Sequence, residues 1–275
     1  MEAARRRQRP ASLFNEYGKL MVIAADHAAR GALRAGSRGL AMADRVELLD
    51  RLCLALSRPG VNGVLGTPDI VEDLLVLGAL DGKVVIGSMN RGGLAGTAFE
   101  IDDRFTAYDA ASLAAAGFEG GKMLLRIDPD DPATVATVTA CARAVGELAE
   151  RQLLAMIEPF IAHRVDGRVR IDLGVEATIR AMTVAAGLGT TSAYTWLKVP
   201  VVDQMERVMA ATTLPALLLG GEVSADQEAA FERWRQALKL PSVVGLVIGR
   251  SLLYPPDDDV AAAVDAAVGL MEERR

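Results

Sequence analysis

The sequence predicts an α/β protein, a single-domain (β/α)₈ barrel, on three observations. Eight short apolar segments recur along the 275 residues, an amphipathic helical pattern follows each one, and no linker or low-complexity tract interrupts the series. About half of the residues (51%) are apolar, enough for one large core, and the length is typical of one barrel domain. An open doubly wound sheet is the alternative, but eight evenly spaced units in this length favour closure. We expect residues 21–275 to form the barrel and residues 1–20 a tail or a cap on its base.

The expected strands are short aliphatic runs, and each ends near a polar residue or a glycine. They are MVIAAD (21–26), VNGVLG (61–66), KVVIGS (83–88), KMLLRI (122–127), LLAMIE (153–158), SAYTWLK (192–198), PALLLG (215–220) and VGLVIG (244–249). The helical patterns that follow them cover 41–57, 68–80, 107–116, 132–151, 175–187, 202–211, 225–238 and 258–272. Asp69 and Pro132 lie near helix starts, and Gly117 and Gly187 near helix ends, as helix capping predicts. The third and fifth connections contain longer loops.

Composition and charge exclude several classes of partner. The net charge of −6 gives no general attraction to nucleic acid or to an anionic membrane, so an anionic ligand needs a local site. Cys53 and Cys141 fall inside helical patterns without metal-ligand spacing and are expected to be free thiols. There is no apolar run of transmembrane length and no signal-peptide core, which predicts a cytoplasmic protein. The Arg-rich start, EAARRRQRP, favours a mobile tail or a base cap over a transit peptide.

Polar residues gather where the expected strands end, which is the rim that carries the active site in barrels of this kind. Five strands contribute them: Asp26, Ser88 with Asn90 just beyond, Lys122 and Arg126 within the fourth strand, Glu158, and Lys198. Because side chains alternate along a strand, Lys122, Glu158 and Lys198 can all point inward. Charges inside a barrel are costly unless paired. A structural ion-pair cluster explains any one of them, but the whole set at matching strand ends indicates a site.

The chemistry that suits this set is imine formation. A lysine amine attacks a ketone only when neutral, and its usual pKa near 10.4 keeps it charged. A second ammonium at Lys122 and partial burial would lower the pKa of Lys198. Glu158 is suited to shuttle protons, and Asp26 to accept a hydrogen bond from a substrate hydroxyl or to orient a lysine. His27, in AADHAARG, either shares the proton transfers or is a solvated loop residue.

Two segments indicate a phosphate site. The seventh strand ends in LLLGGE and the eighth in VIGR, so Gly220, Gly221 and Gly249 leave room for backbone N–H groups to approach an anion, and Arg250 adds a cation. We therefore expect a phosphorylated small molecule as substrate.

The long third connection, MNRGGLAGTAFEIDDRF, is of the kind that often forms a lid. Arg91 or Arg126 is positioned to meet a second anionic group of the substrate, or each serves as an ordinary ion-pair residue. The chain has only two histidines, His27 and His163, and no clustered metal ligands, so we expect no metal and no cofactor.

These residues resemble the class I aldolases related to tagatose-bisphosphate aldolase, within the deoxyribose-phosphate aldolase superfamily. The similarity covers nearly the whole barrel, through AADHAARGAL, GGKMLLRIDPD, AMIEPF, TWLKVPV, LLLGGE and VIGRSLLYP. It implies a Schiff-base lysine at Lys198, with Asp26, Lys122 and Glu158 around it, and phosphate held by the glycines and Arg250.

More narrowly, the chain resembles an actinobacterial-type subgroup associated with myo-inositol breakdown. That resemblance implies cleavage of 6-phospho-5-dehydro-2-deoxygluconate to glycerone phosphate and malonate semialdehyde. Tagatose-bisphosphate, fructose-bisphosphate and deoxyribose-phosphate aldolases, a transaldolase and a thiolase remain alternatives, as does a non-catalytic sugar-phosphate-binding barrel. Archaeal-type fructose-bisphosphate aldolases use a tyrosine on the fifth strand as proton donor, whereas Glu158 is found here, which weakens the fructose-bisphosphate assignment. Barrels of this kind often associate, so a homo-oligomer is possible.

Overall fold

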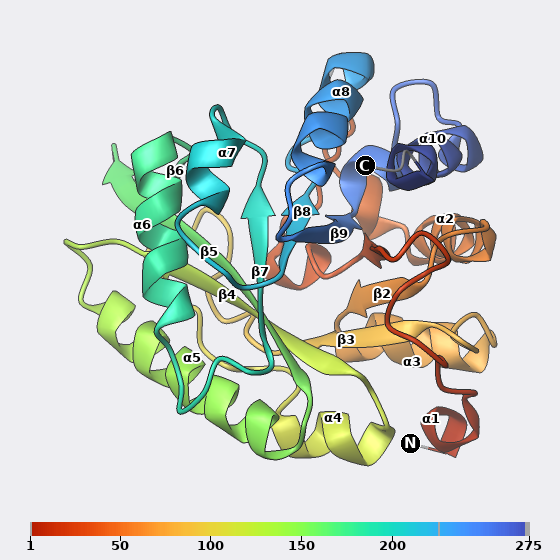
Figure 1. Cartoon of the computed structure of the whole chain (residues 1–275), viewed down its shortest axis with the longest axis horizontal. Coiled ribbons are helices and arrows are strands. Elements are labelled where there is room, and N and C mark those ends of the chain that lie inside the picture. Colours follow the sequence, from red (N-terminus) through yellow and green to blue (C-terminus); the bar gives the residue numbers. More distant parts are fainter. Residues whose placement is uncertain (1, 225, 273–275) are drawn as a thin grey trace.

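The computed structural model describes residues 2–224 and 226–272, and in it eight parallel strands close into a barrel (Figure 1). The barrel strands are β1 (Leu20–Ala24), β2 (Gly63–Gly66), β3 (Val84–Ser88), β4 (Gly120–Ile127), β5 (Leu154–Val165), β7 (Thr195–Pro200), β8 (Ala216–Leu219) and β9 (Val243–Ile248). Each pairs with the next around the ring, β9 pairs with β1, and β4 pairs with β5. The predicted single-domain barrel is confirmed.

Helices follow the strands and form the outer layer of the barrel. They are α2 (Arg45–Ser57), α3 (Pro68–Val76), α4 (Ala110–Ala116), α5 (Ala133–Glu150), α6 (Val175–Ala186), α7 (Met205–Met209), α8 (Gln227–Leu238) and α10 (Val260–Glu272), with short helices α1 (Glu2–Arg6) and α9 (Arg250–Leu253) and 3₁₀ turns η1 (Ala28–Arg30) and η2 (Ala41–Ala43). Every expected helix is present, most of them a few residues shorter than predicted. Local capping fixes several of these boundaries, because Asp44, Asp109 and Asp226 each accept a backbone N–H from the first turn of α2, α4 and α8.

The fifth connection differs from the predicted loop. Strand β5 continues past residue 158 to Val165, turns at Asp166–Gly167, and returns as β6 (Arg168–Asp172), which pairs antiparallel with it. Both turn residues have positive φ, 50° and 74°, the conformation of a two-residue hairpin turn that Asp-Gly favours. The connection is therefore a β-hairpin that stands on the barrel rim.

The fourth strand begins two residues earlier than predicted. Gly120 and Gly121 belong to β4, so Lys122 is its third residue and not its first. Glycine is a poor strand former, but a Cβ at Gly120 would lie 2.5 Å from the carbonyl oxygen of Leu154, so the close approach of β5 accounts for it. Lys122 still starts low in the barrel, beside Ser88 and Met156.

The core has two layers. Inside the barrel, aliphatic side chains such as Val22, Ile86, Met156 and Leu217 fill the lower part, and a larger cluster lies between the strands and the helices. Burial of this apolar surface provides most of the stabilisation of such a fold.

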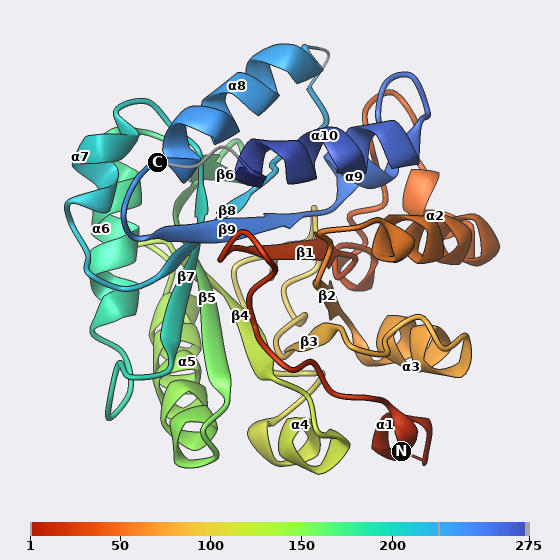
Figure 2. The ribbon, with the colours of Figure 1, turned by 45° about the vertical axis from the view of Figure 1, so that its right-hand side comes forward.

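The N-terminal segment crosses the base of the barrel, as Figure 2 shows for the chain between α1 and β1. Arg7 donates to the Gly117 carbonyl and pairs with Glu119 at 2.9 Å, and Leu13 packs against the interior cluster. Phe14 stacks on Trp196 of β7 with ring centroids 5.8 Å apart. These contacts close the end of the barrel opposite the polar rim.

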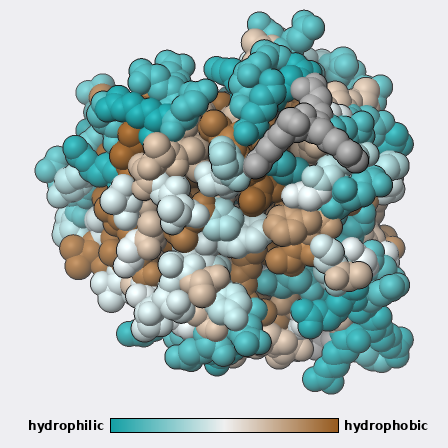
Figure 3. Space-filling view, in the orientation of Figure 1, coloured by the Kyte–Doolittle hydropathy of each residue, from teal (hydrophilic) through white to brown (hydrophobic). Residues whose placement is uncertain are grey.

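Hydrophilic side chains surround much of the face seen in Figure 3, with apolar ones in small groups nearer its centre. None of the helices in the described part of the chain is long and apolar enough to span a membrane.

Candidate active site

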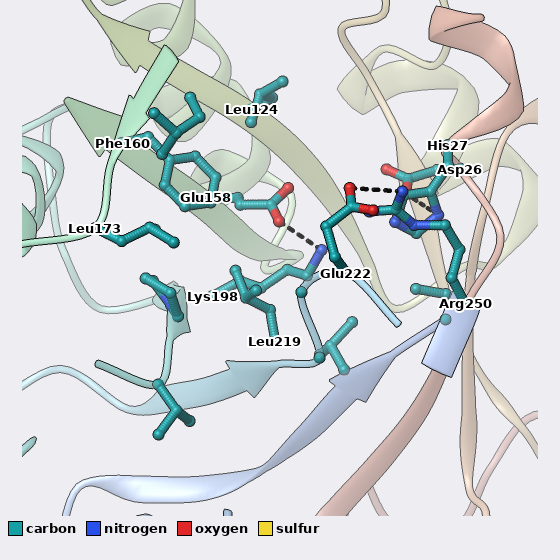
Figure 4. A pocket seen from close by; sticks show the side chains of 18 of the residues that line it. Asp26, His27, Leu124, Glu158, Phe160, Leu173, Lys198, Leu219, Glu222 and Arg250 are labelled. Atoms are coloured by element: carbon teal, nitrogen blue, oxygen red, sulfur yellow. Dashed lines mark hydrogen bonds and ion pairs between the residues drawn. The ribbon is translucent and has the colours of Figure 1, made fainter. Parts of the chain in front are cut away.

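A cavity of about 490 Å³ opens at the rim where the barrel strands end. The loops after the strands line it, together with the inward side chains of β4, β5 and β7. Figure 4 shows Lys198 and Glu158 near its middle, with Phe160 and Leu173 on one side and Glu222, Arg250 and His27 on the other. The rim predicted to carry the chemistry therefore holds the cavity.

Lys122, Glu158 and Lys198 form a buried chain of two lysines joined by one carboxylate. The Lys198 Nζ lies 2.7 Å from Oε1 of Glu158, and the Lys122 Nζ contacts the other oxygen, Oε2. Register explains the geometry, since Ile157 pairs with Leu197 and so sets Glu158 level with Lys198. Lys122 starts two residues lower, beside Met156, and its long side chain reaches up to the carboxylate.

Asp26 lies on the far side of Lys122 and is also buried. Its Oδ2 accepts from Lys122 Nζ at 3.2 Å and from Ser88 Oγ at 3.2 Å, and forms an ion pair with Arg91. Arg91 also donates from Nε to Ser88 Oγ at 2.8 Å. Asp26 and Glu158 thus hold Lys122 between them, whereas Lys198 has Glu158 as its single carboxylate partner among the described residues.

Burial lowers the pKa of both lysines, and nearby cations lower it further. For Lys122 these are Arg91 and Lys198, and its pKa falls well below the usual value; for Lys198 they are Arg91 and Arg250. Burial raises the pKa of Glu158, but the two lysines outweigh it and hold that pKa well below normal. Arg91 and the ammonium of one lysine together balance the negative charges of Asp26 and Glu158. The other lysine can therefore be neutral at little cost in free energy.

The pKa values alone do not select the nucleophile between the two lysines, because that of Lys122 is lowered more strongly. The contacts distinguish them. Lys122 is only 1% exposed and is held by two carboxylates, while Lys198 is 3% exposed, has one carboxylate partner and lies nearer the rim. Lys198 is the amine with the easier approach for a ligand in the cavity.

The glycines and Arg250 lie together after β8 and β9. Gly220, Gly221, Gly249 and Arg250 all line the cavity. A Cβ at Gly220 would lie 2.6 Å from Ile248, and one at Gly249 would lie 2.3 Å from the Ala24 carbonyl, so neither site has space for a side chain. The rim carboxylate of Glu222, 74% exposed, pairs with Arg250 at 2.9 Å. A cation beside open backbone on this side of the cavity suits a phosphate group.

His27 lies beside this side of the cavity. Its Nδ1 is 4.0 Å from Asp26 and is a buried atom without a hydrogen-bond partner in the described structure. Burial, with Arg250 and Lys198 next in importance, lowers its pKa well below 6.5, so the imidazole is neutral near pH 7. It is a partly buried side chain at the cavity and not a fully solvated one.

The third connection is folded down over the rim and anchored by Arg126. The guanidinium of Arg126 makes a two-point contact with Asp103, at 2.9 and 2.6 Å, and bonds to Glu100 at 3.1 Å. Arg126 lines the cavity but already has carboxylate partners from this loop. Arg91 also lines the cavity, and burial lowers its pKa to about 10.

Two residues expected near the substrate are fully buried and are not among the described residues that line the cavity. Asn90 bonds the backbone of β4, donating to the Leu124 carbonyl at 2.6 Å and accepting from the Leu124 N–H at 2.7 Å. Ser88 bonds Asp26 and Arg91. A polar residue near a strand end can thus form hydrogen bonds with a neighbouring strand or side chain and not with a ligand. The alternation of side chains along a strand does not distinguish these two roles.

The sequence alone did not reveal the opposite, apolar wall of the cavity or two of its arginines, Arg30 and Arg233. Phe160 of β5 and Ile171 of β6 line the cavity from the hairpin, and Arg30 of η1 lines it from the loop after β1. The Asp-Gly turn in HRVDGRVRID was the available signal for the hairpin. Arg30 gave none, because it lies six residues beyond the end of β1.

Within the described residues there is no group of three or more His, Cys, Asp and Glu side chains that could hold a metal ion.

Among solved structures, Cgl0159 from Corynebacterium glutamicum is 54% identical to this chain, with a TM-score of 0.95, over 98% of this chain and 90% of that one. An archaeal fructose 1,6-bisphosphate aldolase has a TM-score of 0.70 at 18% identity, over 94% of this chain and 96% of that one. Another archaeal fructose-1,6-bisphosphate aldolase, with its catalytic Lys bound to a carbinolamine intermediate, has the same TM-score and identity over 95% and 97%. At this identity the two aldolases support the fold alone.

No curated protein matches the sequence. A family model described as Cgl0159-like matches residues 18–268, nearly the whole barrel. The chain therefore belongs to the Cgl0159-like family.

Proposed function

We propose that the chain is a class I aldolase that cleaves a phosphorylated ketose through an imine on Lys198. The observation that carries the proposal is the buried Lys122–Glu158–Lys198 chain at the bottom of a cavity whose rim has open glycine backbone and Arg250. A plain ion-pair cluster needs no cavity above it and no second lysine. Imine chemistry needs both a neutral amine and a nearby proton carrier.

The reaction begins when the neutral amine of Lys198 attacks the ketone carbon of the substrate. The ketone oxygen takes up one proton from water in the cavity and becomes the hydroxyl of a carbinolamine. Glu158 accepts the proton that the amine loses and donates it to this hydroxyl, which leaves as water. The product is an iminium ion between Lys198 Nζ and the former ketone carbon. Lys122 keeps its contacts with Asp26 and Glu158 throughout, so its charge balances theirs as the protonation of Glu158 changes.

Cleavage follows when the hydroxyl two carbons from the iminium carbon loses its proton to a base. The bond between the two intervening carbons breaks, its electron pair moves to the iminium, and an enamine and a free aldehyde are formed. Protonation and hydrolysis of the enamine return Lys198 and release a phosphorylated ketone. Glu158 is the base we assign to the hydroxyl, because its carboxylate lies against Lys198.

The substrate we favour is 6-phospho-5-dehydro-2-deoxygluconate, which yields glycerone phosphate and malonate semialdehyde. Its ketone is adjacent to the phosphate-bearing carbon, which suits a phosphate on Arg250 and the glycines beside an imine on Lys198. The resemblance to proteins of myo-inositol breakdown supports the same choice.

The test is reductive trapping of the imine. Wild-type protein is incubated with glycerone phosphate and cyanoborohydride, digested, and mapped by mass spectrometry, with Lys198→Met and Lys122→Met in parallel. We expect an adduct on Lys198 in the wild type and none in Lys198→Met. An adduct on Lys122 would reverse the two roles, and no adduct at all would refute the imine. A panel of phosphorylated ketoses, assayed with and without a chelator, then identifies the substrate by release of glycerone phosphate.

A further inference from the structure

The charges that line the cavity do not balance. Among the described lining residues, seven side chains are cationic, namely Arg30, Arg91, Lys122, Arg126, Lys198, Arg233 and Arg250, and four are carboxylates, namely Asp26, Glu100, Glu158 and Glu222. Lys198 is neutral in the proposed reaction and Arg126 is paired with Asp103 behind the lining, so six cations face five carboxylates, an excess of one positive charge in a chain whose net charge is −6. Such an excess favours an anionic ligand.

Most of these cations have a carboxylate partner within the described structure. Arg126 pairs with Asp103 and Glu100, Arg91 with Asp26, both lysines with Glu158, and Arg250 with Glu222. Arg30 and Arg233 have no ion pair there. Arg233 is exposed on α8, where water solvates it, so Arg30 is the cation whose situation needs a physical explanation.

Arg30 is held in position but its guanidinium is not satisfied. Its carbonyl accepts a hydrogen bond of 2.8 Å from the Ala95 N–H of the third connection, and Gly31 in the left-handed conformation (φ 74°) closes the turn η1. Its Nη1 is buried and has no hydrogen-bond partner in the described structure. A buried guanidinium nitrogen without an acceptor is costly, so such a group is completed by water or by a ligand, and its place in the cavity lining makes it accessible to a ligand.

We propose that Arg30 binds a carboxylate on the part of the substrate that leaves as the aldehyde. The inference rests on the proposed aldolase function, and it adds the residue that recognises the carboxylate of a phosphorylated keto acid. The hydrogen bond between the Arg30 carbonyl and the Ala95 N–H attaches Arg30 to the loop after β3. The glycines and Arg250 follow β8 and β9, and these two strands lie across the barrel from β3 and β4. A substrate whose phosphate lies on Arg250 and whose ketone lies on Lys198 extends its other end towards Arg30.

The chemistry favours a carboxylate over a second phosphate. One unpaired guanidinium matches a monoanion with two oxygens, which a planar fork binds in a two-point contact. The lysines and Arg126 already have carboxylate partners and add no further cation for a second phosphate.

The experiment runs the reaction in the direction of synthesis with saturating glycerone phosphate and varied aldehyde. Malonate semialdehyde is compared with propanal, which has the same chain length but no carboxylate, and with glyceraldehyde 3-phosphate. The variants are Arg30→Met and Arg30→Lys, with Arg233→Met as the matched control that removes the other unpaired cation from the same cavity.

We expect Arg30→Met to raise the KM for malonate semialdehyde by about 100-fold, because a charged two-point contact is lost. The KM for propanal should change by less than about threefold. Arg30→Lys should recover part of the loss, and Arg233→Met should alter both aldehydes by less than about threefold. Equal losses for malonate semialdehyde and propanal, or a larger loss for glyceraldehyde 3-phosphate, would overturn the proposal.

Trapping of glycerone phosphate separates this inference from the function on which it rests. Arg30→Met should still form the imine on Lys198 at the wild-type rate, which also verifies its folding. Failure of the wild type to form that imine would refute the aldolase proposal, and the subsite with it. A normal imine with no selective effect of Arg30→Met would refute the subsite alone.

Discussion

Replacement of Glu158 by glutamine is the change that separates its two proposed effects on Lys198. The carboxylate contacts both lysines, Lys198 at 2.7 Å, and its negative charge raises the pKa of each against the lowering effect of burial. Glutamine keeps the size of the side chain and removes the charge. The amine should therefore be neutral at lower pH than in the wild type, although the proton carrier has been lost.

The magnitude follows from the contact. Two unit charges about 4 Å apart at an effective dielectric constant of about 20 interact by about 4 kcal/mol, which corresponds to about three pKa units. Because the carboxylate is shared between two lysines, we expect the lysine-controlled acid limb of imine formation to move down by about one to three pH units. Loss of proton transfer should lower turnover about 10²- to 10⁴-fold at every pH.

The assay follows single-turnover imine formation by cyanoborohydride trapping and steady-state cleavage, both from pH 5 to 10. Glu232→Gln, the same change on the exposed surface of α8, is the control. If the acid limb of the pH profile for imine formation stays in place or moves to higher pH in Glu158→Gln, Glu158 does not set the lysine pKa. If turnover is unchanged, Glu158 has no catalytic role.

Two further predictions concern the rim. Glu222→Gln frees Arg250 from an exposed ion pair worth at most about 1 kcal/mol, so the KM for the phosphorylated substrate should fall by up to about fivefold, measured by steady-state kinetics. A higher KM would mean that Glu222 itself binds the substrate. Arg126→Met leaves Asp103 buried and unpaired, at a cost of about 3–5 kcal/mol, so thermal unfolding should occur about 10 °C lower. An unchanged midpoint, followed by calorimetry, would show that this ion pair does not hold the third connection.

The barrel could be predicted because its pattern is repetitive. Eight apolar runs separated by amphipathic helices leave few topologies, and small errors at each boundary do not accumulate. The hairpin after Glu158 was missed because residues 159–172 include three arginines and two aspartates facing solvent beside apolar ones, so they do not form a continuous apolar run. The error at the start of β4 came from the two glycines, whose presence depends on how closely β5 approaches and not on local preference.

The site was predictable only where strand geometry fixes it. Lys122, Glu158 and Lys198 project inward from neighbouring strands, and the alternation of side chains brings them together as predicted. Loop residues follow no such rule. Asn90 lies beyond the end of β3 and turns back to the β4 backbone, while Arg30 reaches the cavity from the middle of a loop.

The hairpin gives the protein a part that can change in length without a change in the chemistry. Strand β5 runs unbroken from the level of Glu158 through the rim to Val165. It pairs with β4 up to Ile161 and with β6 from Ile161 onward, so one continuous strand joins the carboxylate to the apolar wall above it. The turn at Asp166–Gly167 is exposed. Addition or removal of residues in pairs on both strands near that turn preserves which side chains face inward. Evolution or design can therefore raise or lower this wall, and so alter the length of ligand that fits the cavity, while the lysine-bearing layer below it keeps its register.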